Sequence, residues 1–291
     1  MKMQDRFSKY AILLTLSSLL AAVCAEAQSA SHPANKKAGK APIRAVAESV
    51  VPSLEPKAVE ILKATSERLK AAHTVAFTAV ETFESADRFG HPIIFATKSE
   101  VTLQRPDKLR VVMSADGPAS EFYYDGKVMM AYAPVENLLA IADAPPTIDS
   151  ALEAAYHAAA IYFPFTDLIV ADPYNDLAPG LKLAYYIGQS QVVGGTTTDM
   201  VAYSGDGVFA QIWIGAEDKL PRVVHVVYLD DPAQLRHNLL LSNWQLDAAV
   251  TAESFAPANT ENAKRIPFAH PRPEPAAGAT PPLKGQGKPS R

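Results

Sequence analysis

The seven histidines are the residues of this chain best suited to chemistry, because imidazole binds metal ions and transfers protons near neutral pH. A zinc protease would carry a His-Glu-x-x-His helix, and a serine hydrolase of the α/β class would carry a Gly-x-Ser-x-Gly turn. Neither pattern occurs, and Gly194-Gly195 is typical of a hairpin turn rather than of a phosphate-binding loop. The sequence therefore predicts no catalytic residue, no metal ligand and no cofactor.

His225 has the most unusual setting of these histidines, since it lies in a valine-rich strand and shares a strand face with Val223 and Val227. A histidine in such a strand is more often packed in a core or at its rim than used in catalysis. A hydrolase remains the weaker alternative, and it requires an inward-facing aspartate bonded to His225. The neighbouring carboxylates Asp230 and Asp231 precede a proline and are typical of a turn.

Apolar side chains indicate a different kind of site, a hydrophobic hollow. Large apolar residues recur at every second position in the first half of the chain, which places them on one face of a sheet. If they leave space, each buried methylene of an acyl chain contributes about 0.8 kcal/mol. The alternative, that side chains fill this interior completely, stays open. The expected ligand-binding residues are Phe77, Phe95, Val101, Leu103, Leu109, Val111, Met113, Tyr124, Met130 and Tyr132.

Two helices and about eleven strands are expected to position these residues. The first helix covers 56–72 and begins at a proline, and the second covers 148–163 with Thr147 as its N-cap and Pro164 as its end. Period-two alternation predicts the strands. Their ranges are 74–84, 93–104, 109–114, 121–125, 128–132, 137–142, 181–189, 196–203, 208–214, 222–229 and 238–246.

Turns such as Asp125-Gly126 and Asp206-Gly207 separate these strands, and such short connections join antiparallel neighbours. A strongly twisted sheet of this size exposes an apolar face unless something covers it. The expected fold is therefore α+β, a curled antiparallel sheet with a helix over its open side. Residues 56–268 are expected to form it as a single domain.

The first 27 residues are typical of a secretory signal peptide. Basic Lys2, Arg6 and Lys9 precede the apolar stretch 11–23, and cleavage is expected before Gln28. The mature chain then lacks any stretch long enough to span a membrane. These features predict a periplasmic protein.

Cys24 is the chain's sole cysteine, and it offers lipoprotein anchoring as an alternative to ordinary cleavage. The bulky Val23 before it disfavours lipidation. Residues 28–55 are expected as a disordered N-terminal flank, and 269–291 as a Pro-rich basic tail.

The charge is unevenly distributed along the chain. Residues 56–263 hold 14 basic and 26 acidic side chains, a net charge of −12, whereas the flanks are basic. So acidic a domain repels phosphate backbones, which excludes nucleic acid as a partner.

Two segments, 104–111 (QRPDKLRV) and 124–134 (YDGKVMMAYAP), carry a resemblance to a known group of proteins, supported by 255–257 (FAP) and 264–266 (KRI). The chain resembles the periplasmic lipoprotein carriers of the LolA type, and still more an uncharacterised family of predicted periplasmic proteins with that scaffold. The resemblance implies a curled antiparallel incomplete β-barrel closed by helices, which agrees with the strands expected above, and a cavity for acyl chains. It also implies that Arg105 contacts a lid helix. Fastening the turn to the next strand is the alternative role of Arg105.

Together these observations predict a non-catalytic, monomeric periplasmic binding protein that holds a lipid or an acylated ligand in the concavity of the sheet. The alternative is an envelope interaction or stress-sensing module that uses the same scaffold to bind a protein partner.

Overall fold

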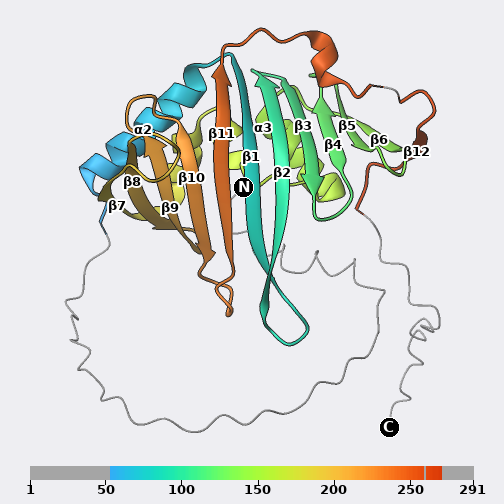
Figure 1. Cartoon of the computed structure of the whole chain (residues 1–291). Helices are drawn as coiled ribbons and strands as arrows, with labels where there is room; N and C mark the ends of the chain where they lie inside the picture. The colour runs from blue at the N-terminus through green and yellow to red at the C-terminus, as the bar shows by residue number, and fades with distance from the viewer. Residues whose placement is uncertain (1–52, 259, 271–291) are drawn as a thin grey trace, which may run out of the picture.

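The sheet of this protein is long, curved and open, and the helices within residues 56–71 and 148–180 lie on its concave side (Figure 1). The computed structural model describes residues 53–258 and 260–270. The expected signal peptide, Cys24, most of the N-terminal flank and the basic tail lie outside these residues.

Helix α2, Pro56–Ala71, forms almost where the sequence predicts it. Proline suits the first helical position because its fixed φ is already helical and no intrahelical acceptor is needed there. The spacing of Ala58, Ile61, Leu62 and Leu69 brings them to one face, and that face is buried. Ala58, Ile61 and Leu62 pack on the concave face of the last strands of the sheet.

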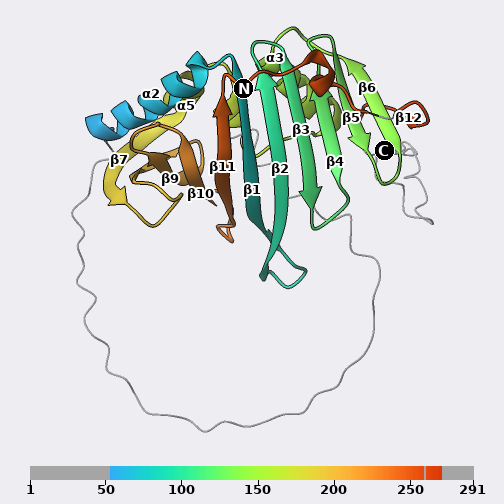
Figure 2. The ribbon, with the colours of Figure 1, turned by 45° about the horizontal axis from the view of Figure 1, so that its top comes forward.

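Twelve strands pair in the order β12-β6-β5-β4-β3-β2-β1-β11-β10-β9-β8-β7 (Figures 1 and 2). Every pairing is antiparallel except that of β12 with β6, and the edge strands β12 and β7 do not meet, so the barrel is incomplete as expected. The strands are β1 Thr74–Ala86, β2 Pro92–Gln104, β3 Lys108–Ala115, β4 Ser120–Tyr124, β5 Val128–Ala133, β6 Leu138–Asp143, β7 Leu181–Ser190, β8 Thr198–Gly205, β9 Val208–Gly215, β10 Pro221–Tyr228, β11 Arg236–Leu246 and β12 Lys264–Ile266.

The predicted strands correspond to β1 to β11, and β12 is an addition. Three residues without alternation give no sequence signal, because a strand this short is specified by its partner rather than by its own pattern.

The connection from β6 to β7 crosses the concave face of the sheet. It contains α3 Ile148–Ala159, α4 Thr166–Ile169, α5 Pro173–Leu177 and the short η2 Ala178–Gly180; a further 3₁₀ turn, η3 Ala252–Phe255, precedes β12. We call residues 160–172 of this connection the covering segment.

Helix α3 begins as predicted and ends earlier. Thr147 caps it through a reciprocal hydrogen-bonded pair with Ser150. The helix stops at Ala160, whose left-handed conformation redirects the chain four residues before Pro164, the expected end. The reason lies in packing, since the chain beyond Ala160 carries Phe163 and Phe165 into the core.

Candidate ligand-binding site

The predicted site residues are not all on one surface. Tyr124 pairs with Met129 across β4 and β5, and Tyr123 pairs with Met130. Met130 and Tyr132 therefore lie on the opposite face from Tyr124, in a small cluster with Tyr123 and Leu139. Those brought together in the main core are Phe77, Val101, Leu103, Leu109, Val111 and Tyr124, with Met113 packed against them.

Phe95 lies apart from this core, near the free end of the β1–β2 hairpin. Its side chain is 37% exposed and stacks on Phe83 at a ring-centroid distance of 5.7 Å. The expectation that Met130 and Tyr132 line one concavity with the others was therefore wrong in geometry, whereas Phe95 shares the concave face but lies beyond the main core. Whether a ligand contacts any of the ten residues stays a prediction.

Over the β1–β4 half of the sheet, the protein's own side chains fill the concavity. Phe165 meets Phe77 edge to face and stacks on Phe163, with ring centroids 5.5 Å apart in both cases. Ile169 and Leu103 have no measurable exposure. On this half, the alternative left open by the sequence, a filled interior, is what the structure has.

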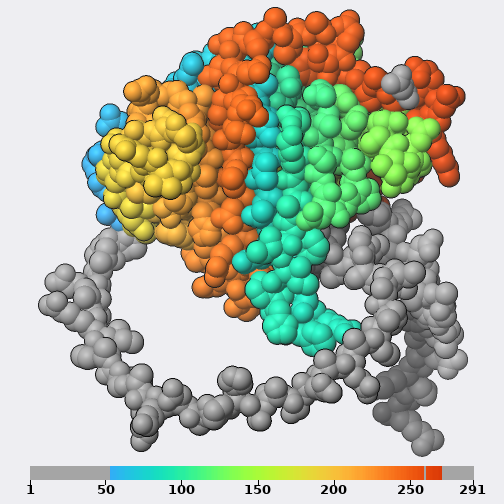
Figure 3. Space-filling view, in the orientation of Figure 1, coloured from blue at the N-terminus to red at the C-terminus, as the bar shows by residue number. Residues whose placement is uncertain are grey.

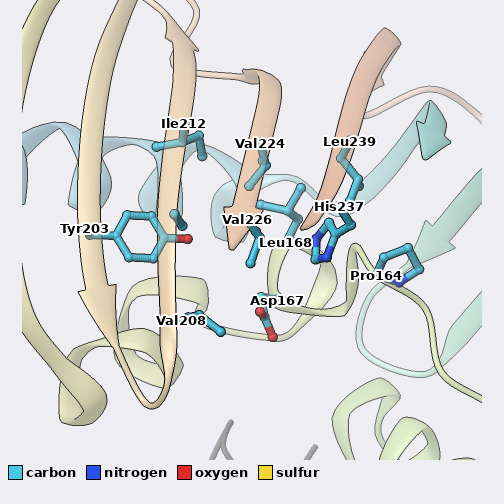
Figure 4. Close-up of a pocket in the computed structure, with 11 residues that line it drawn as sticks. Pro164, Asp167, Leu168, Tyr203, Val208, Ile212, Val224, Val226, His237 and Leu239 are labelled. Carbon is cyan, nitrogen blue, oxygen red and sulfur yellow. The ribbon is translucent and has the colours of Figure 1, made fainter. Parts of the chain in front are cut away.

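A hollow remains over the other half of the sheet, between β8–β11 and the covering segment (Figure 4). Its volume is about 60 Å³. Its walls are mainly apolar, with polar groups at Asp167, Tyr203 and His237. The lining residues are Pro164, Asp167, Leu168, Tyr203, Val208, Ala210, Ile212, Val224, Val226, His237 and Leu239.

The strand register explains how these residues meet. Antiparallel partners share a face, so side chains line up in rows across the sheet. One row runs Thr97, Glu81, Leu239, Val224 and Ile212 from β2 to β9. Glu81 is therefore the direct neighbour of a residue that lines the hollow, and it lies at the edge of the hollow.

The next row runs Phe95, Phe83, His237, Val226 and Ala210. This row places the imidazole of His237 diagonally across from Glu81, in the wall of the hollow. Glu81 and His237 thus lie close together within a mainly apolar part of the concave face.

His237 is buried, and burial lowers its pKa to about 4, with a smaller contribution from His225. Its Nδ1 shares a hydrogen bond of 2.7 Å with the hydroxyl of Tyr228. Burial also raises the pKa of Tyr228. The pair is therefore neutral over the physiological range.

Burial raises the pKa of Glu81 to about 7, against a lowering effect from the Thr97 hydroxyl, which donates a hydrogen bond of 3.3 Å. No cation among the described residues bonds to this carboxyl. Carboxyls with raised pKa values in a hollow are candidates for function.

His225, the histidine singled out in the sequence, lies on the other face of the sheet. It pairs with Asn238, whose side-chain oxygen is 2.6 Å from its Nδ1. The partner is an amide, so the aspartate that the hydrolase alternative requires is not found here.

Arg105 lies beneath the end of α4. Its Nη1 donates a hydrogen bond of 3.3 Å to the carbonyl of Ile169, while its buried Nε and Nη2 lack partners among the described residues. Burial lowers the Arg105 pKa, and nearby Asp149 opposes this. Contact with a helix over the concavity is the role that the resemblance implied for this arginine.

Few hydrogen bonds and ion pairs hold the C-terminal end of the covering segment. Asp172 accepts hydrogen bonds from Ser66 and Lys70 of α2, at 3.1 and 2.7 Å. The Asp149 carboxylate accepts from the backbone N–H of Ala171. Except for the buried Ser66, these side chains are partly or largely exposed, and exposed ion pairs contribute about 1 kcal/mol or less.

A second, larger hollow of about 310 Å³ follows the outside of α3. Its lining includes Asp149, Ser150, Glu153 and Asp176, so it is polar and suits water better than an apolar ligand.

A family model described as "Predicted periplasmic protein (DUF2092)" matches residues 58–269. The chain belongs to this family. The resemblance that the sequence carries to such a family is thereby confirmed. None of the helices in the described part of the chain is long and apolar enough to cross a membrane. No curated protein matches the chain.

Several solved structures are similar at low identity. They include the MucA/MucB complex of Pseudomonas aeruginosa, at 12% identity, 70% of this chain, 62% of that chain and a TM-score of 0.39. A putative outer membrane lipoprotein-sorting protein domain from Vibrio parahaemolyticus is 10% identical; the match covers 68% of this chain and 96% of that one, with a TM-score of 0.31. A LolA superfamily protein from Nitrosomonas europaea is 8% identical; the match covers 69% of this chain and 97% of that one, with a TM-score of 0.29.

The chain spans less than two thirds of the MucB chains that it matches. TM-scores this low carry no argument about ligand or partner.

Proposed function

We propose that this protein is a non-catalytic periplasmic binding protein, which holds the apolar part of a lipid or an acylated molecule between the concave face of β8–β11 and the covering segment. The observation that carries the proposal is the hollow beneath α4, because it is apolar and closed by a short, broken stretch of helix. Concave apolar sites with a few polar groups are the usual form of small-molecule sites.

The hollow must widen to admit a chain. A volume of about 60 Å³ equals that of roughly two water molecules in the liquid. Burying a twelve-carbon chain contributes on the order of 10 kcal/mol before entropy losses, so binding can drive such an opening. The weak polar bonds at Asp172 and Asp149 favour opening at this end of the covering segment, while Phe163 and Phe165 hold its first part in the core.

Filling the hollow is expected to abolish binding. Ala210 is buried in its wall on β9, and Ala210→Leu adds a branched side chain there, whereas Gln211→Leu adds the same kind of group on the opposite face. Titration with N-phenyl-1-naphthylamine, an uncharged fluorescent probe, measures the site. Ala210→Leu is expected to reduce probe affinity at least tenfold, and Gln211→Leu to leave it unchanged.

Thermal unfolding checks that both variants fold, and Ala210→Val provides a smaller change if leucine overpacks the site. Native mass spectrometry of protein from the periplasm tests for a natural ligand. A strictly ligand-free species that also takes up no probe would refute the proposal.

A second candidate function, binding of a protein partner in the envelope, is favoured by the free end of the β1–β2 hairpin, which extends past the body of the protein (Figure 3). Phe89 is 69% exposed and Ile94 is 64% exposed there. Exposed apolar groups gathered in this way mark interaction sites.

Replacing both hairpin residues, Phe89→Ser with Ile94→Ser, is expected to remove a crosslinked partner if this candidate is correct and to leave uptake of the uncharged probe unchanged. Val192→Ser, which alters a 90% exposed residue outside the hairpin, is the control. A crosslinking pattern identical in all three proteins would eliminate the hairpin as the partner site.

A further inference from the structure

The charges around the hollow restrict which ligands fit it. Two carboxyls border it, Glu81 at the edge of the floor and Asp167 in the roof, and no lysine or arginine lines it. The cation of Arg105 lies under Ile169, which belongs to the filled half of the core. Among the described residues that line the hollow, an anionic head group would therefore meet carboxyls and no lysine or arginine.

The other polar groups near Glu81 cannot neutralise it once it is ionised. Thr97 on β2 donates a single bond to it; His237 on β11 and Tyr228 on β10 are bonded to each other. Tyr203 on β8 and Asp167 on α4 face the hollow; burial raises the pKa of both Tyr203 and Tyr228, and the Asp167 carboxylate adds a smaller effect. None of these groups, all among the described residues, carries a positive charge near neutral pH.

We propose that the hollow selects an amphiphile whose polar end is a hydrogen-bond-donating cation, of which an alkylammonium is the simplest example, and that Glu81 binds this cation. This rests on the function proposed above, and it names the ligand class. An unpaired carboxylate that is withheld from water has an unfavourable desolvation free energy. Pairing it with a cation offsets this cost, since the two opposite charges attract each other. Carboxylate and phosphate amphiphiles are disfavoured by the same site.

The proposal predicts a pH dependence of binding that simple apolar binding lacks. Glu81 must release its proton to pair with the cation, and the pKa of Glu81 in the free protein is about 7. Affinity for an alkylammonium should therefore rise about tenfold between pH 6 and pH 8, because the ionised fraction rises by that factor. Binding of an uncharged chain gains nothing from ionisation of Glu81.

Displacement of N-phenyl-1-naphthylamine tests this with three twelve-carbon probes below their aggregation concentrations: dodecylammonium, dodecanol and dodecanoate. With the wild-type protein at pH 8, dodecylammonium is expected to bind at least tenfold more tightly than dodecanoate. Glu81→Gln should remove both this preference and its pH dependence. Glu84→Gln is the control, since it removes the same charge from the opposite face of the same strand.

The outcomes separate this inference from the function on which it rests. If the fluorescent probe does not bind at all, both fail. If it binds but dodecanoate displaces it as well as dodecylammonium does, or if Glu81→Gln keeps the preference, the cation site is refuted and the apolar hollow stands.

Discussion

Phe165→Ala is expected to lower the free energy of unfolding by about 3 to 5 kcal/mol, the range for removing a buried phenyl ring from a packed core. Phe165 is 1% exposed and fixes the covering segment to the sheet through Phe77; it also stacks on Phe163, which contacts Phe122 of β4. Its loss leaves a cavity that these rings cannot close, because β1 holds Phe77 in place. Urea unfolding followed by tryptophan fluorescence measures the change, since Trp244 stacks on Phe77.

Phe89→Ala is the matched control, because it removes the same ring from a 69% exposed site. A surface substitution of this kind is expected to stay within about 0.5 kcal/mol of wild type. A loss below about 1 kcal/mol for Phe165→Ala would mean that the covering segment is not packed on the sheet as described.

The alternation of apolar residues was sufficient to predict the sheet. Strands β1 to β11, the start of α3 and the open, curled shape all follow from local signals such as Thr147 and the Gly-containing turns. The order of strands across the middle of the sheet does not, because the pairing of β1 with β11 joins residues more than 150 positions apart. Such pairing depends on the whole chain.

The site was harder to predict than the fold. Met130 was assigned to the wrong face because Met129 and Met130 are equally apolar, and only the register with Tyr124 decides between them. The polar groups of the hollow were missed although a signal existed. Glu81 occupies an inward position between Ala79 and Phe83, where alternation leads one to expect an apolar residue.

Glu81→Gln is expected to stabilise the protein above pH 7 by on the order of 3 kcal/mol and to leave stability unchanged below pH 4.5. The folded-state pKa of Glu81, about 7, is raised above the unfolded value of about 4.5. Its contribution is therefore fully present below pH 4.5 and is lost as pH rises through 7, where the folded state must hold a buried charge. Glutamine keeps the neutral form at every pH.

His237 behaves in the opposite sense, since its pKa of about 4 is lowered from about 6.5. Its contribution is present above pH 6.5 and is lost as pH falls through 4. Between pH 4.5 and 6.5 the two slopes are equal in size and opposite in sign, so together they contribute almost no pH dependence to the wild type. Replacing Glu81 alone should therefore reveal the pH dependence of stability that His237 causes, and replacing His237 alone should reveal that of Glu81.

Urea unfolding at half-unit steps from pH 4 to pH 8 measures these slopes as differences between variant and wild type, in which the contributions of all other carboxyls cancel. The Glu81→Gln difference should rise across pH 4.5 to 7, and the His237→Asn difference should rise as pH falls from 6.5 to 4. Glu136→Gln, at an exposed loop position, controls for net charge. Parallel curves for Glu81→Gln and wild type would show that the carboxyl is fully solvated in the folded protein, and the hollow would then lack the partly buried acid on which recognition of a cation depends.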